Sequence, residues 1–85
     1  MYGRRKYKHL RIIRKGEKMK LDIFQIQKRM IAFGFTQGKL GERAGISRQS
    51  VNTILTRGTC SVLNAGRLAE ALNCELEDIV VIERG

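Results

Sequence analysis

The sequence predicts an all-α fold, a compact domain of five short helices that follows a basic N-terminal extension. Apolar residues recur at steps of three and four through most of residues 21–72, which is the spacing of amphipathic helices. Each helical stretch ends at a glycine or an asparagine, residues suited to a left-handed helix end. With 85 residues, 42% of them hydrophobic, the chain can build one modest core but not two. We therefore assign residues 21–85 to the domain and residues 1–20 to the extension.

The first helix is predicted to begin after Asp22. This residue is a favourable N-cap, and Gln25 follows three positions later, as in a capping box. The helix then carries one apolar stripe, formed by Ile23, Ile26, Met30 and Phe33. Gly34 ends it, because glycine adopts a left-handed backbone at no steric cost.

The second helix is predicted over residues 37–44, between the N-cap Thr36 and the stop at Gly45. It contains Gly38 and Gly41, and each glycine costs roughly 0.5–1 kcal/mol relative to alanine in a helix interior. A helix this short that tolerates two glycines must be held by packing against its neighbours.

The third helix is predicted to run from Arg48 to about Thr56, between the N-cap Ser47 and the stop at Gly58. Three of its apolar residues should face the core: Val51, Ile54 and Leu55. A fourth helix follows from Ser61 to about Leu72. After Asn73, a predicted left-handed cap, residues 76–82 favour one short turn of helix and then a short strand over residues 79–82.

Residues 37–57 form the most informative stretch, because two short helices are joined there by a very tight turn. Five apolar anchors hold the unit together: Leu40, Ala44, Ile46, Val51 and Ile54. Gly41 lies where the helices must approach closely, and Gly45 permits the reversal of the chain. This is the spacing of a helix-turn-helix, the motif that presents its second helix to the major groove of DNA.

This part of the sequence resembles the Cro/phage-repressor (XRE-type) helix-turn-helix family. The resemblance runs from about Ile23 to Ile82, and two stretches carry it: TQGKLGERAGISRQSVNTILTRG at 36–58 and LAEALNCELEDIV at 68–80. Family members usually carry a polar or acidic residue in place of Gly38 and alanine in place of Gly41. The loop at 58–61 is also short, without the proline often found there.

The resemblance and the helical spacing together predict the DNA-contacting residues. The base-reading candidates are Arg48, Gln49, Asn52 and Thr53. Their side chains suit base edges, since arginine pairs with guanine, glutamine and asparagine pair with adenine, and the threonine methyl contacts thymine. The phosphate-contacting candidates are Gln37, Lys39, Ser50, Thr56 and Arg57, with the role of Gln37 implied by the family.

These features predict a sequence-specific DNA-binding transcriptional regulator, a repressor or an autoregulator, from a bacterium, a phage or a mobile element. Its partner would be double-stranded DNA. We expect a homodimer, because one recognition helix covers only half an operator. The apolar C-terminal run is the expected dimer surface, with the N-terminal segment as second choice. The alternative is a protein-interaction module, such as an antitoxin or anti-repressor, on the same fold.

Other classes of function find little support in the sequence. No paired carboxylates, nucleophile constellation or phosphate-binding glycine loop points to an enzyme, and we expect no cofactor, metal site or small-molecule ligand. Neither a membrane span nor a secretory signal is evident, so a cytoplasmic protein is expected. Cys60 and Cys74 are expected to be free, partly buried and inert thiols.

The charge of +9 belongs mainly to the N-terminal segment. Residues 1–18 hold eight Lys/Arg and one Glu (+7), whereas residues 19–85 hold nine Lys/Arg and seven Asp/Glu (+2). Three interpretations stay open for the segment: a DNA-binding arm, a strand at residues 7–13 that pairs with residues 79–82 or with a second subunit, and a disordered extension. In a fourth, codons for Lys15-Gly16-Glu17 form a ribosome-binding sequence and translation begins at Met19, which the intact mass of the natively expressed chain would test.

Overall fold

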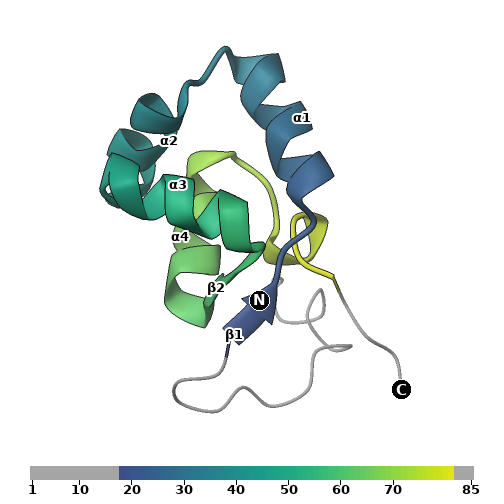
Figure 1. The fold of residues 1–85 in the computed structure, drawn as a ribbon. Helices are drawn as coiled ribbons and strands as arrows, with labels where there is room; N and C mark the ends of the chain where they lie inside the picture. The colour runs from purple at the N-terminus through teal and green to yellow at the C-terminus, as the bar shows by residue number, and fades with distance from the viewer. Residues whose placement is uncertain (1–17, 82–85) are drawn as a thin grey trace.

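The computed structural model of this chain describes residues 18–81. In chain order its elements are β1 (Lys18–Lys20), α1 (Ile23–Phe33), α2 (Gln37–Ala44), α3 (Arg48–Arg57), β2 (Thr59–Ser61), α4 (Val62–Ala71) and the 3₁₀ helix η2 (Leu76–Asp78) (Figure 1). The helices pack around one core, and the two short strands lie side by side next to the C-terminal end of α3.

The α-helices begin and end where the sequence signals predict, because local caps fix their ends. Each N-cap side chain accepts the backbone N–H three residues further on, at 3.1–3.2 Å; these residues are Asp22, Thr36, Ser47 and Ser61. Left-handed glycines with φ between 72° and 77° end α1, α2 and α3, at Gly34, Gly45 and Gly58. Since one such N-cap contributes about 1 kcal/mol, the caps help define helices too short to be stable alone.

The predicted fifth helix is only the single 3₁₀ turn η2, so residues 18–81 contain four α-helices instead of five. Asn73 adopts the predicted left-handed conformation, with φ 55°. The N–H of Glu75 then donates to the Asp78 carboxylate at 2.9 Å, which closes one turn. The β-branched residues that follow do not continue the helix. In place of the predicted strand, Val80 forms an isolated β-bridge with Leu21. The last residue of the predicted strand, Ile82, lies outside the described residues.

The fold also contains a two-stranded antiparallel sheet that the sequence pattern does not predict. Lys18 lies opposite Ser61, Met19 opposite Cys60, and Lys20 opposite Thr59. The stretch 58–61, expected as a loop, therefore supplies β2, and residues 18–20, expected in the basic extension, supply β1. The predicted strand at residues 7–13 lies outside the described residues.

The core is apolar throughout, with no buried polar or charged residue among residues 18–81. Its largest fully buried side chains come from every part of this stretch: Ile26, Leu40, Val51, Leu68, Leu72 and Ile79. Ile79 and Val80 are 0% and 5% exposed, so these residues of the C-terminal run pack inward and are not available to a second subunit. The expectation that this run forms the dimer surface is therefore wrong for both residues.

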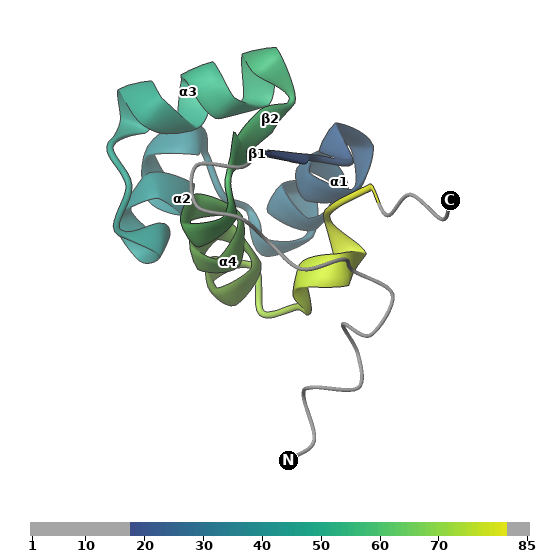
Figure 2. The same ribbon diagram turned by 90° about the horizontal axis from the view of Figure 1, so that it is seen from below.

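Seen from below, α3 lies along one side of the domain and α4 along the other, with α2 beside both (Figure 2). No other described element covers the outer side of α3 in this view. Within residues 18–81 no helix has both the length and the apolar composition needed to cross a membrane.

Candidate nucleic-acid interface

Gly41 allows α2 and α3 to cross closely. A Cβ atom at this position would overlap the carbonyl oxygen of Ile46 and lie 3.3 Å from the Cγ2 atom of Val51. The N–H of Ile46 also donates to the Gly41 carbonyl at 2.8 Å, which draws the turn onto the end of α2. The close approach predicted from the sequence is thus present, and it sets the direction in which α3 leaves the turn.

The outer face of α3 is polar and exposed. Val51 and Ile54, which are 1% and 7% exposed, hold the inner face against the core. At about 100° per residue, four residues fall on the arc directly opposite them: Gln49, Asn52, Thr53 and Thr56, all exposed. Three of these are predicted base-reading residues, and Thr56 lies one turn further toward the C-terminal end.

Arg48 lies at one edge of this arc, beside α2. A Cβ atom at Gly38 would be 3.8 Å from the Cδ atom of Arg48, so the arginine stem leans over the first turn of α2. Arg48 is exposed and forms no ion pair with an acid of residues 18–81. Its guanidinium is therefore available at the N-terminal end of α3, where recognition helices contact bases.

Apart from Thr56, which lies on the polar arc itself, the predicted phosphate contacts flank the arc on two sides. Gln37 and Lys39 lie on the first turn of α2, where the helix dipole also favours an anion. The Nζ atom of Lys39 lies 3.6 Å from the Oε1 atom of Glu42. This exposed ion pair contributes little to stability, so the ammonium is free to exchange partners. Ser50 and Arg57 lie on the opposite side, where they face β2 and the start of α4.

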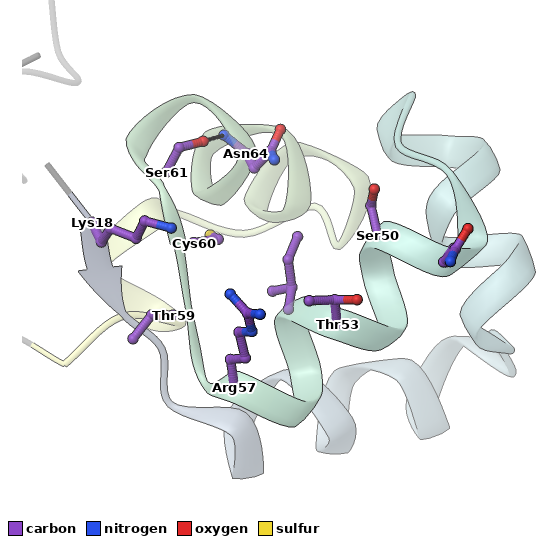
Figure 3. Close-up of a pocket in the computed structure, with 10 residues that line it drawn as sticks. Lys18, Ser50, Thr53, Arg57, Thr59, Cys60, Ser61 and Asn64 are labelled. Carbon is purple, nitrogen blue, oxygen red and sulfur yellow. Dashed lines mark hydrogen bonds between the residues drawn. The ribbon is translucent and has the colours of Figure 1, made fainter. Parts of the chain in front are cut away.

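A pocket of about 410 Å³ lies on that opposite side, between α3, β2 and the first turn of α4. Figure 3 shows Arg57 and Thr53 of α3 facing Lys18 of β1 across it. Six of its lining residues were not among the predicted site residues: Lys18, Ile54, Thr59, Cys60, Ser61 and Asn64. The available sequence signal was the absence of acids between Arg43 and Glu70, but this does not show which residues meet in space.

Comparison with known proteins agrees with this geometry. A model of the family described as helix-turn-helix matches residues 26–79, more than half of the chain. The chain belongs to the helix-turn-helix family. This match supports the resemblance to the Cro/XRE-type members, whose domains bind DNA. It spans most of α1 through η2 and does not include β1. No match was found among curated proteins or among solved structures.

The two cysteines are free thiols that lie in different surroundings. Burial raises the pKa of Cys60 to about 11, although the nearby Lys18 ammonium opposes the shift. Burial also raises the pKa of Cys74, which is only half-buried. No group of three or more potential metal-binding side chains occurs among residues 18–81.

Iodoacetamide at pH 8 is expected to modify Cys74 well before Cys60 in the folded protein. The reagent attacks the thiolate, and Cys60 is both 4% exposed and shifted away from the thiolate form. Mass spectrometry of peptides over a time course measures both rates. The unfolded protein is the control, because both thiols should react faster and at equal rates in it. Equal rates of modification in the native protein would contradict the buried position of Cys60.

Proposed function

We propose that this chain is a sequence-specific DNA-binding transcriptional regulator, a repressor or an autoregulator, that places α3 in the major groove. The polar arc of α3 carries the proposal, because it combines exposed hydrogen-bonding side chains with a complete absence of acids over residues 44–69. A surface without carboxylates is not repelled by the phosphate backbone on either side of the groove.

Base reading is assigned to the N-terminal and central part of the arc. Arg48 would pair bidentately with a guanine, and Gln49 and Asn52 with adenines, while the Thr53 methyl would contact a thymine. Each good bidentate contact provides about 1–3 kcal/mol of discrimination against the wrong base. These side chains should therefore determine which sequence is bound.

Backbone contacts are assigned to the two flanks of α3. Gln37 and Lys39 would hold phosphates at the first turn of α2, and Ser50 and Arg57 on the pocket side of α3. Thr56 would reach a phosphate from the last turn, since base contacts concentrate near the N-terminal end of a recognition helix. Such contacts fix the register of the protein on the duplex without reading sequence.

We further propose that the chain binds DNA as a homodimer, with two copies of α3 in half-sites about 34 Å apart. Ile79 and Val80 are buried in their own core, so the dimer contact must use other side chains. Sedimentation equilibrium with and without operator DNA measures the stoichiometry. Two chains per duplex are expected, and one chain on a duplex that contains both half-sites would contradict the dimer.

A protein-interaction module is the second candidate, because α1 exposes large apolar side chains. Phe24 and Ile31 are 69% and 80% exposed, and their spacing of seven residues places them on one face of the helix. Such a face could contact a protein partner in place of, or in addition to, DNA.

A gel shift with the upstream region of the chain's own gene, repeated over a salt titration, separates the two candidates. DNA recognition predicts a shift that weakens steeply with salt, and a reporter driven by this region that falls when the chain is expressed. Absence of a salt-sensitive shift, together with no effect of Arg48→Ala or Gln49→Ala, would favour the protein-interaction module instead.

A further inference from the structure

Among residues 18–81, the side chains that line the pocket beside α3 include two cations and no carboxylate. Figure 3 shows the Lys18 ammonium and the Arg57 guanidinium both directed into it, from β1 and from the end of α3. None of the described lining residues is an acid, and neither cation forms an ion pair with an acid of residues 18–81. Two like charges that converge without a counter-ion favour an anion between them.

Hydroxyl groups in the same pocket can add hydrogen bonds to such an anion. The Ser61 hydroxyl oxygen accepts the Asn64 N–H at 3.2 Å, and the Ser50 hydroxyl oxygen accepts the Ser47 hydroxyl at 2.9 Å. Each of these two hydroxyls keeps its own hydrogen for donation. The lining is therefore rich in donors, as a site for phosphate oxygens requires.

Strand pairing and core packing of β1 fix the position of the Lys18 backbone beside the pocket. Lys18 lies opposite Ser61 in the sheet, and the next residue, Met19, is 7% exposed and part of the core. A slip of one residue in this register would turn Met19 to solvent. The N–H of Leu21 also donates to the Gly58 carbonyl at 2.8 Å, which holds the other end of β1.

We propose that Lys18 and Arg57 together hold one backbone phosphate of the bound DNA, beside the bases that α3 reads. This inference rests on the proposed function, since it assigns the pocket to the same duplex. β1 lies outside the residues that the family model matches, 26–79, and it brings a further cation to the proposed DNA surface. Lys18 is then a positioning residue that sets affinity and register without reading a base.

The test compares Lys18→Ala with Lys28→Ala, which removes an exposed lysine of α1 outside the pocket. Binding of each full-length variant to its selected duplex and to a random duplex is measured over a range of salt. For Lys18→Ala we expect weaker binding to both duplexes alike and a slope of log K against log[salt] that is shallower by about 1. Lys18→Arg should keep the wild-type slope.

Two results would overturn the proposed phosphate site, and they differ in what else they affect. If the wild-type chain binds DNA but the slope of Lys18→Ala equals that of Lys28→Ala, the site is refuted and the proposed function stands. If the wild-type chain shows no salt-sensitive binding, the proposed function and the site fail together. Unchanged thermal unfolding of Lys18→Ala verifies that the exposed substitution leaves the fold intact.

Discussion

Replacing Gly41 by alanine is expected to lower the free energy of unfolding by about 1–3 kcal/mol, the usual cost of overpacking. The added Cβ atom would overlap the carbonyl oxygen of Ile46, which is backbone and cannot rotate away, and would press on Val51. Relief requires α3 to move outward from α2. The same substitution should therefore weaken specific DNA binding, because the recognition helix is displaced.

Gly66→Ala is the matched control for this prediction. Gly66 lies in α4, and a Cβ atom there would meet nothing within 4 Å. Alanine at this position should raise the free energy of unfolding by about 0.5–1 kcal/mol through helix propensity alone. Urea unfolding followed by circular dichroism measures both variants. A Gly41→Ala protein as stable as Gly66→Ala would show that the approach of the two helices is looser than the structure indicates.

Replacing Arg48 or Gln49 by alanine is expected to reduce the affinity for the specific site by about 1–3 kcal/mol, roughly five- to 150-fold. Both side chains are exposed, so stability should not change measurably. Gln49→Ala should leave binding to random DNA nearly unaltered, because a base contact contributes little to non-specific affinity. Arg48→Ala should also lower non-specific affinity slightly through the lost charge.

Gln27→Ala serves as the control, since it removes an exposed glutamine from α1. Fluorescence anisotropy with specific and random duplexes gives the ratio of the two affinities for each variant. A ratio for Gln49→Ala that equals the ratio for Gln27→Ala would remove Gln49 from the base-reading residues. The same comparison for Asn52→Ala and Thr53→Ala extends the test along the arc.

The helix ends were predictable because their causes are local. Asp22, Thr36, Ser47 and Ser61 each satisfy an N–H only three residues away, and the glycines that end α1 to α3 act on their own backbone. The polar arc of α3 was predictable for a related reason. Once Val51 and Ile54 are assigned to the core, the helical period alone places Gln49, Asn52 and Thr53 outside.

The sheet was not predictable, because its strands have three residues each and are separated by about forty positions of sequence. A stretch this short carries no periodic pattern, and Lys18–Lys20 has the composition of the basic segment before it. The pocket that Lys18 and Arg57 both line depends on this strand pairing, so it could not be predicted from the sequence. The inward packing of Ile79 and Val80 could not be predicted either, because an apolar run has the same composition in a core as in an interface.

Selection of bound sequences from a random pool of duplex DNA is the sharpest test of sequence-specific recognition by α3. We expect the wild-type chain to enrich a motif with two related half-sites, centred about 34 Å apart. Arg48→Ala and Gln49→Ala should each relax the preference at one position in each half-site. A wild-type pool that shows no enriched motif after repeated rounds would contradict sequence-specific recognition by α3.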